Sequence, residues 1–316
     1  MESYIYKTQK DELGYFQIEN GSCYTFPMDN STIHVGKGDW DRHFAFERLG
    51  SSYTGTQSLT DENIREGMAY FLSKHLGRGG ISIVDKIQTH DAGLYFYRIN
   101  RGEPLLSDTQ ILSNSLLDEV RAYENITESL IDIFRTLEPE TNNFNAYGNK
   151  IRELLIISCT EVEYLLKKFL TDNNIPHARS FYTTSDYVSC LPILKLEKYC
   201  VEAMLFPGLG TLTPFLNWSV SKPTKSLSWY DAYNEVKHDR GGTKNKATLK
   251  ALLDSIAAIH ILLESQYGKE LFEYRFQHTF RTIFQTKTRP TWNLIDYATP
   301  LLTNQKVEWL APKTYP

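Results

Sequence analysis

Residues 147–170 read YGNKIRELLIISCTEVEYLLKKFL, and the prediction of a helical fold for the second half of the chain rests on them. Its apolar and small residues step by 4, 3, 4, 3 and 4 positions, the spacing of one face of an α-helix. They are Ile151, Leu155, Ser158, Val162, Leu165 and Phe169. We therefore expect a long helix within 143–173 that packs along this face on another helix.

A suitable partner helix follows at 244–267, which carries an unusually broad apolar face. Such a face is typical of a helix inside a bundle. Between the two, 229–240 reads WYDAYNEVKHDR and predicts a short helix, capped by Ser226 or Ser228 and ended by Gly241-Gly242. Residues 107–137 predict one or two further helices. Residues 175–222 are ambiguous, and a β-hairpin inserted between helices fits them.

The first hundred residues have a different character. Short alternating stretches in 1–60 favour strands and turns, and a helix is expected from Thr60-Asp61 to Gly77. The β-branched and aromatic runs 81–88 and 94–100 predict a hairpin.

We therefore expect a mainly α protein. Its parts are a small mixed α/β N-terminal region at 1–104 and a helical domain at 105–316 with an insertion at about 175–222. The C-terminal tail, with Trp292 and Trp309, is expected to cover the helical domain.

Composition limits the function only broadly. The 316 residues include 34 Lys plus Arg and 38 Asp plus Glu, for a formal net charge of −4, and 41% are hydrophobic. That content of apolar residues predicts a folded core and excludes a wholly disordered chain. The net charge excludes a basic coat over the whole surface, so any contact with nucleic acid is expected at a local patch.

The sequence also favours a cytoplasmic location. The N-terminal MESYIYKTQKDELGYF has no secretory character, and the most apolar run, 256–263, is shorter than a membrane span. The four cysteines form no CxxC pair and show no zinc-ligand spacing. We therefore expect a reduced protein without metal, cofactor or membrane segment.

Polar chemistry concentrates in 229–240. Asn234 and His238 are four residues apart and share one helix face, with Lys237 beside them and Arg240 just beyond. A histidine beside cations can transfer protons near neutral pH, and the cations suit a phosphate backbone. The alternative is an ordinary solvated helix end whose cations complement the helix dipole. On this segment alone, the alternative is favoured.

A second clue lies in the long helix. Glu161 falls at the edge of its apolar face, where a carboxylate is costly unless a cation or donor meets it. Lys237, His238 and Arg240 are the expected suppliers. A pair formed by Glu161 and one of these residues would either serve catalysis or only fix how the two helices dock, and both roles are open.

The order of the long helix 147–170, an insertion, the motif WYDAYNEVKHDR and an apolar helix resembles the HEPN superfamily (higher eukaryotes and prokaryotes nucleotide-binding domains) over roughly 105–290. That superfamily comprises small helical bundles, many of them bacterial RNases of toxin–antitoxin, phage-defence and CRISPR-associated systems. Its signature is an Arg, a polar residue, a few further residues and a His. Asn234 and His238 match the polar and His positions. Tyr233 stands where the signature has Arg.

The resemblance implies a metal-independent endoribonuclease, usually a dimer, with RNA as substrate and an antitoxin or defence component as a possible partner. His238 would act as general acid or base, and Lys237 or Arg240 would stabilise charge on the phosphate. Asn234 would orient the histidine or hold a phosphate oxygen, and Glu161 would set its tautomer. The rival functions are a catalytically inactive module that binds RNA, nucleotide or protein, and a scaffold that serves only for dimerisation.

One further stripe combines aromatic and basic residues. Arg275, His278 and Arg281 alternate with Phe272, Phe276 and Phe280 on a possible helix. Such a stripe suits contact with RNA or a protein partner. More often it is a solvated face that covers the edge of a core.

Overall fold

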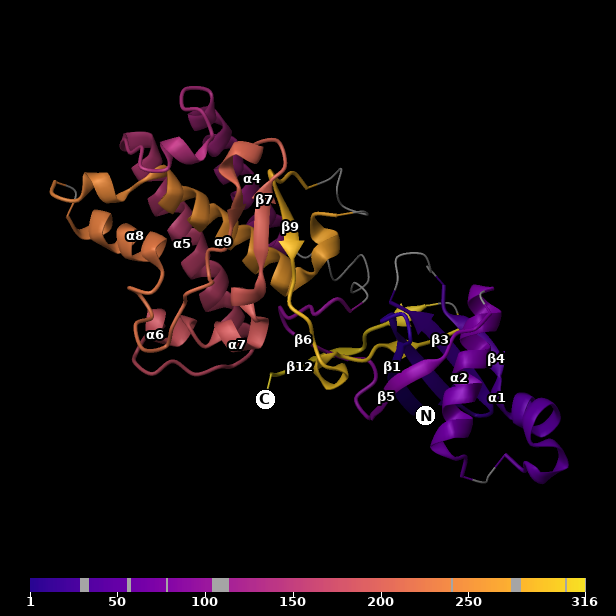
Figure 1. The fold of residues 1–316 in the computed structure, drawn as a ribbon. Helices are drawn as coiled ribbons and strands as arrows, with labels where there is room; N and C mark the ends of the chain where they lie inside the picture. The colour runs from indigo at the N-terminus through magenta and orange to yellow at the C-terminus, as the bar shows by residue number, and fades with distance from the viewer. Residues whose placement is uncertain are drawn as a thin grey trace. The chain divides into compact units, whose positions relative to one another are not determined.

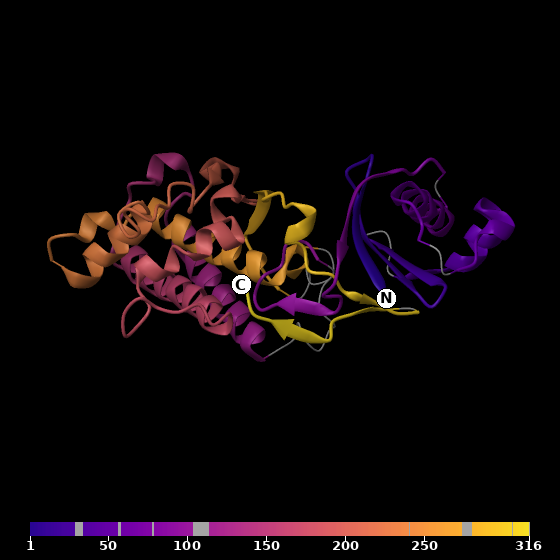
Figure 2. The same cartoon turned by 90° about the horizontal axis from the view of Figure 1, so that it is seen from below.

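The computed structural model describes residues 1–28, 34–55, 58–77, 79–103, 114–239, 241–273, 280–304 and 306–315. The chain forms two compact units (Figures 1 and 2). Unit 1 comprises Met1–Phe96, Arg101–Ser107 and Trp292–Lys313, and unit 2 comprises Tyr97–Asn100, Asp108–Thr291 and Thr314–Pro316. The expected boundary at Pro104 falls outside the described residues.

Unit 1 is built on a five-stranded antiparallel sheet in the order β4-β3-β2-β1-β5. Its strands are β1 (Glu2–Thr8), β2 (Leu13–Glu19), β3 (Ser22–Pro27), β4 (Gly36–Asp39) and β5 (Ile83–Thr89). β1 lies between β2 and β5 and is almost continuously buried, so both faces of the sheet must be covered.

Helices cover one face of this sheet. The short α1 (Trp40–Arg42) continues into a π-helical turn, His43–Arg48, and α2 (Asp61–Leu76) follows. Their core with the sheet is aromatic, and Trp40 stacks on Phe71 at 5.8 Å between ring centroids. Gly38 permits this close packing, because a Cβ there would lie 2.3 Å from Cε1 of Phe71. α2 runs from its cap Thr60 to the left-handed Gly77, as the sequence predicts.

The C-terminal segment covers the other face. It contains β10 (Leu301–Leu302), which pairs with β11 (Val307–Glu308), and Leu294 and Leu302 pack on Ile5 and Tyr15. The fully buried Gln17 fixes the segment: its amide donates to the Pro300 carbonyl (2.6 Å) and accepts from the Leu302 amide (2.8 Å). The tail that we expected over the helical domain, including Trp292 and Trp309, thus belongs to unit 1.

The predicted hairpin of 81–88 with 94–100 is wrong. β5 pairs with β1, whereas β6 (Leu94–Phe96) pairs in parallel with β12 (Ala311–Lys313). Both runs do form strands, but each pairs with a segment far away in the sequence.

Unit 2 is arranged around α9 (Leu249–Tyr267), in which residues 251–266 are all buried. α9 packs on α5 (Asn149–Asp172), α4 (Asn114–Phe134) and α8 (Ser228–His238), as Figure 1 shows. The predicted apolar residues of α5 are all buried. A buried ion pair joins residue 98 to α4, since Arg98 binds Glu119 with two hydrogen bonds of 2.9 Å.

The expected insertion contains short elements and a hairpin. These are α6 (Thr184–Tyr187), α7 (Cys190–Leu194), β7 (Cys200–Ala203) and β8 (Thr211–Leu212). β7 pairs with β8 around a 3-10 turn at Pro207–Leu209, and β9 (Phe284–Thr288) pairs with the other edge of β7. The remaining short turns of unit 2 are Thr141–Asn143, Leu196–Lys198, Lys244–Lys246 and Lys269–Leu271.

The fold class predicted above, a mainly α protein built on a HEPN-like helical bundle, is wrong. Helix accounts for 45% and strand for 19%, and the chain is a mixed α/β protein. The prediction failed because it rested on one strongly periodic region. The N-terminal sheet, the C-terminal strands that complete unit 1 and the sheet β8-β7-β9 depend on pairings between distant segments.

Within the described ranges, none of the helices combines the length and apolar character needed to cross a bilayer.

Candidate functional site

The candidate site lies at the end of α8, whose buried side is aromatic. Trp229, Tyr230, Tyr233 and Val236 are buried, and the indole of Trp229 donates a hydrogen bond of 2.9 Å to the Pro214 carbonyl. These contacts fix the rotation of the helix. Its last turn therefore presents Lys237 and His238 to solvent, with Asn234 half-buried beside them.

A half-buried carboxylate from α5, that of Glu163, contacts this helix. The hydroxyl of Tyr230 donates to one oxygen of Glu163, and that of Tyr233 lies 3.5 Å from the other. Burial and the charge of Glu163 raise the pKa of Tyr230 far above its ordinary value, so this hydroxyl stays protonated. Two tyrosines thus provide the donors that the carboxylate requires between the helices.

Lys237 extends this network to the surface. Its ammonium donates to the Tyr233 hydroxyl at 2.8 Å and lies 4.9 Å from the centre of that ring. The hydrogen bond raises the pKa of Lys237, with a further contribution from Glu163. The lysine is therefore a fixed positive charge one residue before His238.

Asn234 and His238 share the exposed side of α8, as predicted. The amide of Asn234 donates to the Tyr230 carbonyl at 3.1 Å, one turn back along the helix. Among the described residues, none forms a hydrogen bond or ion pair with the imidazole of His238. The imidazole is therefore accessible to an external group, and no protein side chain described here orients it.

The turn after α8 is held by Asp239. Its carboxylate accepts from the amides of Gly241 (3.1 Å) and Gly242 (2.9 Å), and its carbonyl accepts from the Thr243 hydroxyl (2.6 Å). The chain then turns back, so that Lys246 lies 3.7 Å from Glu235 on α8. Lys246 thus lies against α8, the helix whose last turn carries Lys237 and His238. Arg240, the remaining predicted residue of this cluster, lies outside the described residues.

Glu161 does not meet α8. The charges that act on it are those of Glu119 on α4 and Arg98, and burial with Glu119 raises its pKa to about 7. The expected contact of Glu161 with Lys237 or His238 is therefore not formed, and the carboxylate of α5 that contacts α8 is Glu163, through Tyr230 and Tyr233. α5 packs on α4, α8 and α9 together, and the apolar period of one helix does not tell which polar flank faces which partner.

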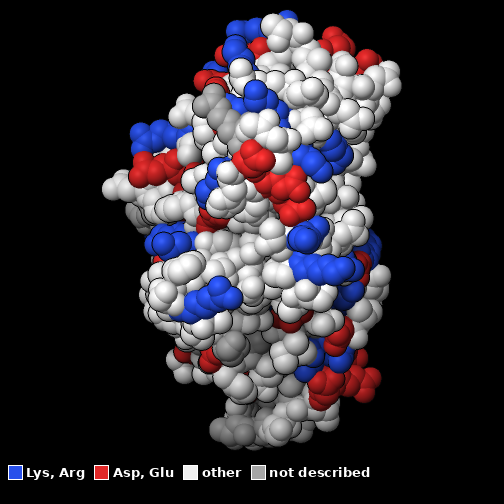
Figure 3. Space-filling model, turned by 90° about the vertical axis from the view of Figure 1, so that its left-hand side faces the viewer, with Lys and Arg blue, Asp and Glu red and all other residues white. Residues whose placement is uncertain are grey.

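The surface around α8 has no continuous basic character. Figure 3 views the molecule from the side on which α8 lies in Figure 1, and Lys and Arg side chains are interspersed there with Asp and Glu. Any contact with phosphate would therefore be local, as the net charge of −4 implies. Over the part of the chain that the structure describes, no group of three or more His, Cys, Asp or Glu side chains is arranged to hold a metal ion.

Comparisons of the chain with known protein families, with curated proteins and with solved structures found no match. The resemblance of 105–290 to the HEPN superfamily therefore stays a prediction from the motif.

Proposed function

We propose that this protein is a cytoplasmic, metal-independent endoribonuclease of the toxin or phage-defence type, with His238 as its general acid or base. The observation that carries the proposal is the end of α8. There the imidazole of His238 is open to solvent while Lys237 is held beside it by Tyr233. A free imidazole next to a fixed cation suits proton transfer at a phosphodiester.

The reaction would use the 2′-hydroxyl of RNA as the nucleophile. A neutral His238 takes the proton of that hydroxyl as its oxygen attacks phosphorus, and the bond from phosphorus to the 5′-oxygen breaks. The leaving oxygen needs a proton from a second acid, which His238 of a second copy would supply. The products are a cyclic 2′,3′-phosphate and a 5′-hydroxyl end. Lys237 would stabilise the charge on the phosphate, and Asn234 would hold a phosphate oxygen.

The test is cleavage of a mixture of structured and single-stranded RNAs by the full chain in EDTA. His238→Ala should reduce the rate at least 100-fold, because both proton transfers lose their catalyst when the imidazole is missing from each copy. His90→Ala is the matched control, since His90 is an exposed histidine of unit 1 and should be neutral. Intact RNA with the wild-type chain, or equal rates for both variants, would overturn the proposal.

A second function is a module that binds RNA, nucleotide or protein without cleaving it. Tyr233 favours this alternative, because it stands at the signature Arg position and is buried against Glu163. No guanidinium therefore projects from that position of the helix. RNA that is retained in a gel-shift assay but stays intact in EDTA would identify this function. Loss of RNA retention in Lys237→Ala and Lys246→Ala would place the binding at the end of α8.

A further inference from the structure

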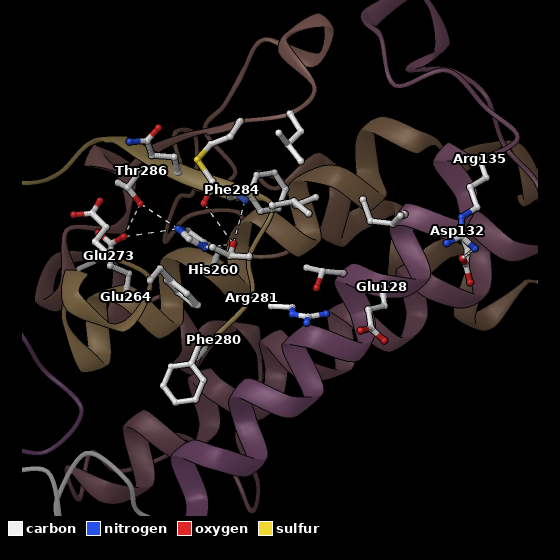
Figure 4. A pocket seen from close by; sticks show the side chains of 18 residues that line it. Glu128, Asp132, Arg135, His260, Glu264, Glu273, Phe280, Arg281, Phe284 and Thr286 are labelled. Atoms are coloured by element: carbon white, nitrogen blue, oxygen red, sulfur yellow. Dashed lines mark hydrogen bonds and ion pairs between the residues drawn. The ribbon is translucent and has the colours of Figure 1, made fainter. Parts of the chain in front are cut away.

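A cavity of about 750 Å³ lies in unit 2, away from the end of α8. It is enclosed by α4, by the chain just after β7, by the second half of α9 and by the segment that leads into β9 (Figure 4). None of its described lining residues belongs to α8. Its volume falls in the range of sites for small molecules, roughly 300–1,000 Å³.

The walls of this cavity are mainly apolar. They include Ile131, Met204, Leu205, Phe272, Phe280 and Phe284. Met204 and Leu205 are 51% and 79% exposed, although both are large apolar side chains. Exposed apolar side chains that line a cavity favour an apolar occupant, because the occupant would remove their surface from water.

The floor of the cavity is polar, but its polar side chains form hydrogen bonds with one another. The buried His260 lies between Thr282, 3.2 Å from Nδ1, and Thr286, 3.2 Å from Nε2, and Phe272 stacks on its ring (Figure 4). Thr286 donates to Glu264 at 2.6 Å. Arg289 donates to Glu264 at 2.6 Å and to Glu273 at 2.7 Å, which balances part of their charge. A ligand therefore meets a rigid floor with a satisfied hydrogen-bond network.

The charges at the open side decide which ligands fit. Asp132 pairs with Arg135 at 2.7 Å, and Glu128 and Arg281 line the space between them and the floor (Figure 4). Glu264 and Glu273 share the single Arg289. Among the described residues, the lining carries the four carboxylates of Glu128, Asp132, Glu264 and Glu273. The guanidinium groups in and beside the lining are those of Arg135, Arg281 and Arg289, so the carboxylates exceed them by one. A negatively charged molecule is disfavoured in such a cavity.

We propose that this cavity is a binding site for a small, largely apolar organic molecule that carries no negative charge. The site is independent of the RNA chemistry proposed for α8 and would give the helical unit a second ligand. The aromatic and aliphatic walls supply the affinity, and the surplus carboxylate supplies the selection by charge.

Two fluorescent probes with the same apolar body test the proposal on the full chain. N-phenyl-1-naphthylamine is uncharged, and 8-anilino-1-naphthalenesulfonate adds one sulfonate to the same rings. We expect saturable binding of one uncharged probe per chain, at least tenfold tighter than that of the sulfonate. No saturable binding, or tighter binding of the sulfonate, would overturn the proposal.

Variants show whether the probe occupies this cavity. Ile131→Trp places a larger ring in the space and should weaken binding of the uncharged probe at least tenfold. The matched control is Ile157→Trp, because Ile157 is an exposed isoleucine on α5 outside the cavity. Equal affinities in these two variants would place the probe elsewhere and reject the site.

Two milder variants keep the test valid if Ile131→Trp does not fold. Leu205→Ser shortens an exposed wall residue and should weaken the uncharged probe about threefold, the loss of part of one apolar contact. Glu128→Gln should narrow the difference between the two probes by strengthening the sulfonate. An unchanged difference in Glu128→Gln would contradict the selection by charge.

Discussion

Two histidines of the helical unit occupy opposite environments. His238 ends α8 in solvent, and no described residue bonds its ring. His260 lies in the middle of α9 with 1% of its surface exposed, stacked on Phe272 and bonded through both ring nitrogens. The exposed ring is free for an external partner, whereas the buried ring is part of the protein's own packing. The chemistry open to a histidine therefore depends on how many of its contacts the fold already supplies.

The carboxylates beside His260 and beside α8 also differ in what stabilises them. Glu264 beside His260 is 3% exposed and depends on Arg289 and Thr286. Glu163 beside α8 depends on Tyr230 and Tyr233, which are neutral donors. Removing a donor should therefore cost most at Glu264, where a buried charge would lose its counter-charge.

Arg289→Met is expected to have the largest effect. It removes the guanidinium from Glu264 and leaves a buried carboxylate, which costs about 3–5 kcal/mol in free energy of unfolding. Urea unfolding of the full chain measures the loss. Lys237→Met is the control at the other site and should cost less than about 1 kcal/mol, because its ammonium group is near solvent. Equal losses in both variants would remove the distinction between the two regions.

The buried histidine should also determine how stability responds to acid. Burial lowers the pKa of His260 from 6.5 to about 3, with a contribution from Arg289. Below pH 6.5 the unfolded chain takes up a proton that the folded chain refuses, so stability falls as pH decreases. From pH 6.5 to 5 this amounts to about 2 kcal/mol. His260→Gln should flatten that part of the profile, and His238→Gln should leave it unchanged. Unfolding free energies measured across this range for both variants are the test.

Glu161 should make stability depend on pH in the opposite direction, with stability falling as the pH rises. Its pKa is raised to about 7 from 4.5, so the folded chain holds a proton that the unfolded chain has released. The stability contributed below pH 4.5 is lost as the pH rises through 7. Because the side chain is partly open to solvent, we expect a loss of about 1 kcal/mol. Glu161→Gln should be more stable than the wild type at pH 8 by that amount, and similar to it at pH 4.5. A variant that gains nothing at pH 8 would contradict the raised pKa of the half-buried Glu161.

Local signals in the sequence predicted the parts of the fold that local chemistry determines. Thr60 caps α2 through the Asn63 amide, and Gly77 ends it with φ of +62°. α5 occupies Asn149–Asp172 within the predicted 143–173. β7 and β8 form the expected hairpin, but the pairing of β7 with β9 joins strands about 80 residues apart and has no local signal.

In the candidate site, too, the sequence predicted what one helix determines and missed what the packing of several helices determines. The four-residue spacing of Asn234 and His238 predicts their common face, because that spacing is a property of one helix. That Glu163 and not Glu161 contacts α8 depends on how three helices pack around α5. The spacing of apolar residues along one helix does not encode that packing. The signal that could have found Glu163 was the pair Tyr230 and Tyr233, two buried hydroxyls that require an acceptor.

The smallest effect on stability is expected for the exposed histidine, His238. His238→Gln should change the free energy of unfolding by less than about 0.5 kcal/mol, because the ring makes no described contact and lies in solvent. The same variant should lose RNA cleavage, since an amide cannot transfer the proton. A residue retained for packing would show stability and activity falling together. Urea unfolding and the cleavage assay on one preparation separate these outcomes, and a stability loss above about 1 kcal/mol would mean that His238, like His260, serves the fold.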